Sequence, residues 1–188
     1  MLSRGAGGRR SLARATGWGE IVVRRELERL RSLGLVEMDR RGTRLTPEGR
    51  RAFAAIIAGV KDAKELRLEE LRLDRLTLGA LVGGATASLP TWHLRDLAIR
   101  EGASGAILIA RRSSELRFSD SNESIAARNP RDAAALRESF PGREGDLIVL
   151  VSASDRRRAH LGLWRIIVEL LPQGGDRSAR AASRKLVV

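Results

Sequence analysis

The stretch that decides the fold of the N-terminal part is Ser11-Leu-Ala-Arg-Ala-Thr-Gly17-Trp-Gly-Glu20. Apolar residues before Gly17 and a longer amphipathic run after it predict a helix, a tight glycine turn and a second helix, which is a helix-turn-helix. At 100° per residue, Leu27 and Leu30 fall within about 40° of Val23, so we expect these three residues to form the buried stripe of the second helix.

Two short segments after this helix alternate in polarity. They are Leu35-Val-Glu-Met-Asp39 and Thr43-Arg-Leu-Thr46, and the turn Arg40-Arg-Gly42 separates them. This pattern predicts a β-hairpin with a basic tip, which in this position is a wing. Thr46 as N-cap, with Pro47 at the first helical position, then predicts a helix that runs to about Gly59.

This part of the sequence resembles the winged-helix domains of prokaryotic transcription regulators. Their pattern is a Leu-rich run, then Gly-Leu-Val, a strand, a turn and Leu-Thr-x-x-Gly. The matching residues here are Leu27, Leu30, Gly34-Leu35-Val36 and Leu45-Thr46-Pro47-Glu48-Gly49. The resemblance implies DNA binding. Such domains normally have another helix ahead of the position of Gly8, and we expect that helix to be missing from a sequence with only seven residues there.

The outward face of the second helix fits a role in reading DNA. Arg24 and Arg25 lie in the half of the helix that a helix-turn-helix places in the major groove, where a guanidinium can bind guanine bidentately. The alternative is a solvated arginine face, which the turn and the hairpin make the less favoured interpretation. The predicted DNA-binding residues are Arg14, Ile21, Arg24, Arg25, Glu28, Arg40, Arg41 and Arg44.

The charge of the chain is uneven. The formal net charge is +12 over 188 residues, and residues 1–58 hold 13 arginines against six acidic residues, whereas residues 59–172 hold 18 basic against 16 acidic residues. A basic excess concentrated on the helix-turn-helix favours a nucleic acid as partner. Only three of the 35 basic residues are lysine, which indicates a GC-rich genome or a thermophile.

Several function classes lack the residues they need. The chain has no cysteine and only two histidines, His93 and His160, so we expect no disulfide, no metal site and no cofactor. No Ser-His-carboxylate set or pair of acids stands out, and we expect no enzyme. No apolar run approaches about 18 residues and no signal peptide is present, so we expect a cytoplasmic protein without membrane contact.

The second half predicts a separate domain of mixed helices and strands. We expect strands at 76–82, 106–110, 115–118 and 146–152, and helices at 91–101, 129–139 and 155–171. We expect one inward face of the first helix to carry Trp92, either Leu94 or Arg95, and Ala98-Ile99. The order βαββαβ plus a helix predicts an α/β (α+β) fold, a ferredoxin-like sandwich, with an open α/β sheet as the alternative. The expected domains are 1–59 (winged helix-turn-helix), 60–72 (linker), 73–172 (α/β domain) and 173–188 (disordered basic tail).

A second resemblance concerns this domain. The string Arg95-Asp96-Leu-Ala-Ile-Arg-Glu-Gly102-Ala103-Ser-Gly105-Ala106, with Gly145-Asp146-Leu-Ile-Val and the helix after Ser154-Asp155, is similar to an archaeal family known only as a domain of unknown function. In that family a winged helix precedes this domain, so the resemblance covers roughly residues 9–171. It implies a transcription regulator and says nothing of a ligand.

The candidate effector or anion site consists of Ser152, Ser154, Asp155 and Arg156, where a buried strand meets the start of the last helix. The alternative there is an ordinary N-cap by Ser154 or Asp155. A ferredoxin-like sheet would separate this loop from the loop at Gly83-Gly84, whereas an open parallel sheet would bring both to one crevice. We expect the first arrangement, with no pocket shared by the two loops.

These observations predict a DNA-binding transcription regulator whose C-terminal domain forms a homodimer or senses a small-molecule effector. Double-stranded DNA is the expected partner. The alternative is a ligand-binding or assembly module whose degenerate winged helix contacts protein.

Overall fold

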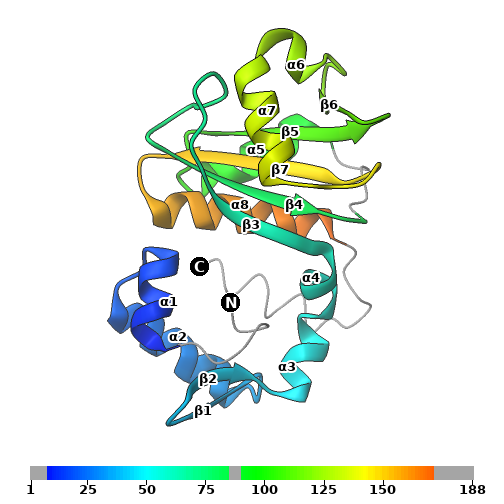
Figure 1. The fold of residues 1–188 in the computed structure, drawn as a ribbon. Helices are drawn as coiled ribbons and strands as arrows, with labels where there is room; N and C mark the ends of the chain where they lie inside the picture. The colour runs from blue at the N-terminus through cyan, green and yellow to red at the C-terminus, as the bar shows by residue number, and fades with distance from the viewer. Residues whose placement is uncertain (1–7, 85–89, 172–188) are drawn as a thin grey trace. The chain divides into compact units, whose positions relative to one another are not determined.

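The computed structural model describes residues 8–84 and 90–171, which form two compact units divided between Ile57 and Ala58. The predicted tail at 173–188 lies outside the described residues. The first unit contains α1 (Arg9–Thr16), α2 (Glu20–Ser32), β1 (Val36–Asp39), β2 (Gly42–Leu45) and α3 (Pro47–Ala52), and α4 (Ala54–Gly59) leads into the second (Figure 1). The predicted order of two helices, a hairpin and a further helix is therefore present.

The turn between α1 and α2 has the geometry that the sequence predicts. Gly17 ends α1 at φ 75°, a left-handed conformation that glycine adopts without steric cost. The predicted stripe of α2 is buried, and Val23 and Leu27 pack against Leu12 and Ala13 of α1. The spacing of the apolar residues is therefore sufficient to orient α2.

Hydrogen bonds of Thr46 join the Gly-Leu-Val and Leu-Thr-x-x-Gly parts of the pattern. Thr46 Oγ1 donates to the Gly34 carbonyl at 2.6 Å and accepts from the Gly49 amide at 2.9 Å, which makes Thr46 the N-cap of α3. A Cβ on Gly49 would lie 2.0 Å from the Leu35 carbonyl oxygen, so only glycine fits there.

The helix predicted from Thr46 to Gly59 is interrupted, which corrects that prediction. Phe53 has φ −103° and ψ 13° and separates α3 from α4. Its half-buried ring packs against the cluster of Leu30, Leu35 and Val36 with Leu45. Because this packing is tertiary, the local helix signal could not reveal the break.

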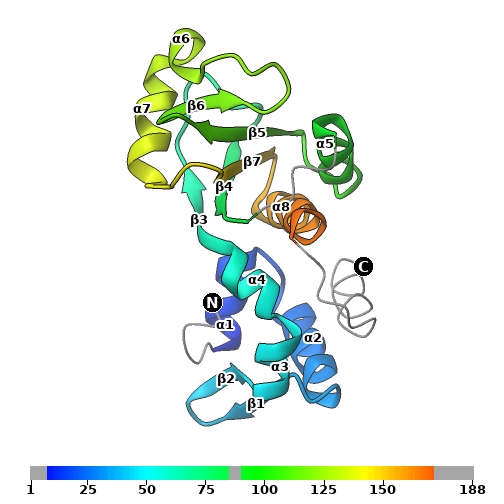
Figure 2. The ribbon, with the colours of Figure 1, turned by 90° about the vertical axis from the view of Figure 1, so that its right-hand side faces the viewer.

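The second unit is an antiparallel sheet with helices on both faces. Its elements are β3 (Val60–Leu66), β4 (Leu76–Val82), α5 (Thr91–Arg100), β5 (Gly105–Arg112), β6 (Glu115–Phe118), α6 (Ile125–Arg128), α7 (Pro130–Ser139), β7 (Leu147–Ala153) and α8 (Arg156–Leu170). The strand order is β3-β4-β7-β5-β6. Helices α5 and α8 cover one face and α7 the other (Figure 2). The α+β class is thus confirmed.

The strand order refines the predicted sandwich. A ferredoxin-like order would place β4 between β7 and β6, whereas here β7 is central and pairs with β4 and β5. Six of the seven residues of β7 are buried, and such an apolar strand is best placed between two others. Neither the ferredoxin-like order nor an open parallel sheet is therefore the observed topology.

Strands β4 and β7 pair in antiparallel orientation, which bears on the predicted separation of the two loops. In β4 and β7, Val82 faces Leu147 while Thr77 faces Ser152. Gly83 and Ser152 consequently lie at opposite ends of this strand pair, about 20 Å apart at 3.4 Å per residue. The two loops cannot line one pocket, as expected.

The segment at 60–72 begins with a strand, which corrects its prediction as a linker. Strand β3 lies at the edge of the sheet and pairs with β4 from Val60 to Leu66. Its sequence carries two lysines and two acids because an edge strand faces solvent, and charged side chains there prevent pairing with other chains. Because of these charges, the sequence of β3 lacks the apolar alternation that predicts a strand.

The predicted inward face of helix α5 is confirmed for Leu94 and Ala98 and corrected for Trp92 and Ile99. Leu94, Leu97 and Ala98 are buried, whereas Trp92 is 59% and Ile99 46% exposed.

Across the described residues, every helix is too short or too polar to span a bilayer.

Candidate nucleic-acid interface

The outward face of α2 combines an apolar side chain with charged ones. Ile21 is 84% exposed in the first turn, and Arg25 and Glu28 lie on the same face further along the helix. Arg14 lies exposed in the last turn of α1. The structure therefore places all the predicted helical DNA-binding residues at the surface of the helix-turn-helix.

Arg24 and Glu28 form an ion pair across one turn of α2. Arg24 Nε donates to Glu28 Oε1 at 2.8 Å, and this hydrogen bond, followed by the charge of Glu28, raises the pKa of Arg24. Both side chains are more than half exposed. Glu28 therefore orients one arginine of the helix and partly neutralises it.

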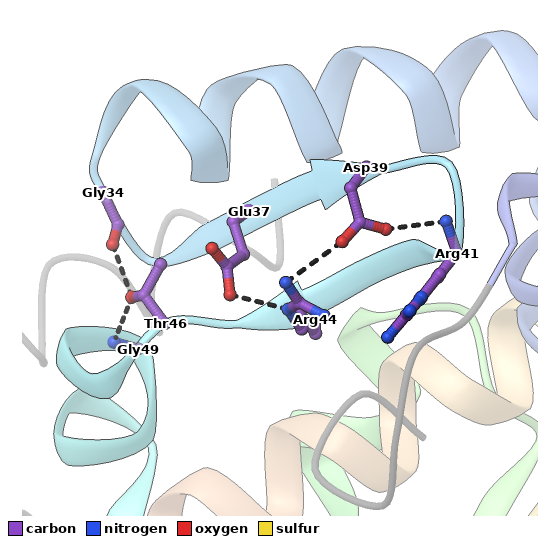
Figure 3. Close-up of polar contacts among 7 residues, drawn as sticks. All are labelled: Gly34, Glu37, Asp39, Arg41, Arg44, Thr46 and Gly49. Carbon is purple, nitrogen blue, oxygen red and sulfur yellow. Dashed lines mark hydrogen bonds and ion pairs between the residues drawn. The ribbon is translucent and has the colours of Figure 1, made fainter.

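The hairpin carries a second set of ion pairs (Figure 3). Arg44 Nε donates to Glu37 at 2.7 Å, and another guanidinium nitrogen lies 3.0 Å from Asp39. These contacts raise the pKa of Arg44, through the hydrogen bond with Glu37 first and then the charges of both carboxylates. Arg44 thus braces the two strands of the hairpin.

The tip of the hairpin presents the remaining two predicted arginines. Arg40 and Arg41 are exposed, and the Arg41 amide donates to Asp39 Oδ1 at 2.7 Å, which fixes the turn. Sequence reasoning missed Glu37 and Asp39 as partners of Arg44. The signal was available, because Glu37 lies directly opposite Arg44 in the antiparallel register.

The four residues of the predicted effector site serve the fold around the start of α8. Asp155 caps the helix by accepting from the Arg158 amide at 2.9 Å, and Ser154 Oγ accepts from the Arg158 guanidinium. Ser152 is buried and hydrogen-bonds Thr77 Oγ1 at 2.8 Å, while Arg156 binds Glu65 on β3. These contacts favour the alternative interpretation, a helix cap.

An open hollow of about 680 Å³ lies beside α5 instead. Its lining includes Leu73, Trp92, Arg95, Ile107 and Phe118. Thr91, Ser119 and Asp120 also line it, so its wall combines apolar side chains with one guanidinium, one carboxylate and two hydroxyls. Within residues 8–84 and 90–171, no group of three His, Cys, Asp or Glu side chains is arranged to hold a metal ion.

The fold and the basic surface define a two-part protein, a helix-turn-helix unit followed by an α+β domain. Residues 4–58 match the family model described as "CggR N-terminal DNA binding domain". Residues 80–170 match the model described as "Domain of unknown function (DUF4443)". The chain therefore carries an N-terminal DNA-binding domain and a C-terminal domain of unknown function, which confirms the two resemblances at this level.

The chain is also similar to a solved structure, a hypothetical protein from Pyrococcus horikoshii, with a TM-score of 0.65. The two are 17% identical, and the match covers 96% of this chain and 86% of the other. This likeness concerns the fold alone. No curated protein matches the chain.

Proposed function

We propose that the protein is a transcription regulator that binds double-stranded DNA through a winged helix-turn-helix, with α2 in the major groove and the β1–β2 hairpin as the wing. The observation that carries this proposal is the match of residues 4–58 to a DNA-binding domain, together with the exposed face of α2. A cytoplasmic location and the absence of enzymatic activity belong to the same proposal.

For the C-terminal domain we favour dimerisation through α5. Trp92 and Ile99 are seven residues apart and so share one face of this helix, and both are exposed. Arg95 and Asp96 lie between them and offer opposite charges to a second copy. A twofold contact requires such a self-complementary surface, because the same residues face each other across the axis.

The experiment that tests DNA binding is a selection of genomic fragments by the purified protein, followed by affinity measurements at several salt concentrations. Binding through arginines should weaken steeply as salt rises, since each phosphate contact releases counterions. Failure to enrich any sequence, with salt-independent retention of a protein partner, would support the assembly module instead.

Sedimentation of wild-type protein and of a Trp92→Ser variant tests the dimer. We expect a dimer that the substitution weakens, with Leu33→Ser, an exposed apolar residue of the N-terminal unit, as the control. An effector in the hollow beside α5 is the second candidate role of this surface. It would be supported if wild-type protein sediments as a monomer and an aromatic acid quenches tryptophan fluorescence in wild type but not in an Arg95→Ala variant.

A further inference from the structure

Ile21 is the most exposed large apolar side chain among the described residues, at 84%. It points away from the stripe of Val23, Leu27 and Leu30 that packs into the unit. A β-branched residue at an exposed helix position also lowers helix propensity relative to alanine or the long charged residues. Folding therefore gives no reason for an isoleucine here.

The location of Ile21 connects it with the proposed contact with DNA. It lies in the first turn of α2, the end of a recognition helix whose residues contact base edges. Arg25 follows four residues later on the same face, about 6 Å along the helix axis. An apolar group and a guanidinium are thus presented side by side to one groove.

In the major groove, one of the four bases offers an apolar contact, because thymine carries a 5-methyl group there. We propose that Ile21 is a specificity-determining residue that packs against the 5-methyl group of a thymine in the operator, with Arg25 binding a guanine about two base pairs away. This inference rests on the proposed function, and it names the chemistry that the operator must offer.

The test uses the full-length protein and the operator obtained by genomic selection. Each thymine is replaced in turn by deoxyuridine, which removes the methyl group and leaves the base pair intact. At one position we expect wild-type affinity to fall about fourfold, the equivalent of one buried methyl-sized group. The Ile21→Ala variant should bind the thymine and deoxyuridine operators equally at that position.

Two matched variants separate this contact from a general loss of binding. Arg25→Ala should weaken binding yet keep the thymine preference. Leu33→Ala removes another exposed apolar side chain, at the far end of α2, and should keep both the wild-type affinity and the thymine preference. Circular dichroism and thermal unfolding test whether Ile21→Ala folds, and we expect that it does, because an exposed residue is changed to a good helix former.

The outcomes distinguish this inference from the proposed function. Equal wild-type affinity for every deoxyuridine operator, or a thymine preference that survives Ile21→Ala, overturns the role of Ile21 and leaves DNA binding standing. A protein that selects no DNA fragment at all overturns both.

Discussion

Nζ of Lys61 lies 2.6 Å from Oδ1 of Asp146, although the two residues are 85 positions apart in the sequence. Lys61 belongs to the edge strand β3, and Asp146 directly precedes the central strand β7. Asp146 is 5% exposed and also accepts from the Arg143 amide at 2.7 Å. This carboxylate therefore ties the edge of the sheet to its centre.

We expect Lys61→Met to lower the free energy of unfolding by about 2–3 kcal/mol, because it leaves a buried carboxylate without its main cation. Asp146→Asn should cost less, about 1–2 kcal/mol, since the half-exposed ammonium of Lys61 can return to water. Urea unfolding of each variant measures this order. Glu138→Gln, an exposed carboxylate on α7, is the control and should change stability little.

The same pair gives a pH dependence. Burial alone would raise the pKa of Asp146, but the hydrogen bonds from Lys61 and Arg143 and the charges of Lys61 and Arg111 outweigh it, so the pKa is lowered. A lowered pKa stabilises the folded state above the unfolded value of about 3.9, and this contribution is lost as pH falls through the folded pKa. Unfolding midpoints between about pH 6 and pH 2.5 should therefore fall more steeply in wild type than in Asp146→Asn. Parallel curves would contradict the assignment.

Thr46 should stabilise the junction between the end of α2, the hairpin and the start of α3. Thr46→Ala removes the N-cap of α3 and the bond to the Gly34 carbonyl, and we expect a loss of about 1–2 kcal/mol. Thr46→Ser retains the hydroxyl and should recover most of it. Thermal unfolding of the three proteins decides the point, and an equal loss for alanine and serine would show that the methyl group matters instead.

Arginines of α2 and of the hairpin tip should affect DNA binding differently. We expect Arg24→Ala and Arg25→Ala to weaken operator binding more than binding to random DNA, each by roughly 1–3 kcal/mol if the contact is bidentate to a base. Arg40→Ala and Arg41→Ala should weaken both kinds of DNA, because a wing mostly contacts phosphates or the minor groove. Arg137→Ala on α7 removes the same charge from the other unit and serves as the control. Equal losses on both DNAs for all four would refute the recognition helix.

The structure could be predicted from the sequence where the residues of a single helix, turn or strand determine its conformation. The buried stripe of α2 follows from the spacing of its apolar residues alone. Gly17 predicts the turn after α1, Thr46 predicts the N-cap of α3, and the apolar run of β7 predicts a buried strand. The candidate DNA-binding residues of α2 could be proposed for the same reason, since a helix with one buried face exposes the other.

Structure that depends on contacts between residues far apart in the chain could not be predicted from the sequence. Strand β3 could be recognised only through its pairing with β4, because its charges suit an edge. Asp132, buried on α7, accepts hydrogen bonds from the amides of Glu69, Glu70 and Leu71 at 2.9, 2.8 and 2.7 Å. These contacts span about sixty positions, so no local pattern signals them. The ion pairs of Arg44 depend on the register of the hairpin, which places Glu37 opposite Arg44.

The pair of Arg24 and Glu28 gives a final prediction, on the balance between specific and general DNA binding. Glu28→Gln removes a negative charge from the surface proposed to face DNA and leaves Arg24 with its full charge toward phosphate. We therefore expect tighter binding to random DNA, with a salt dependence steeper by about one ion. Glu48→Gln, an exposed acid of α3 paired with Arg51, is the matched control for a change of one charge in the same unit. If both variants raise affinity equally, the effect reflects net charge alone. A rise confined to Glu28→Gln, measured by fluorescence anisotropy from low to physiological salt, would show that this carboxylate restrains Arg24 at the interface.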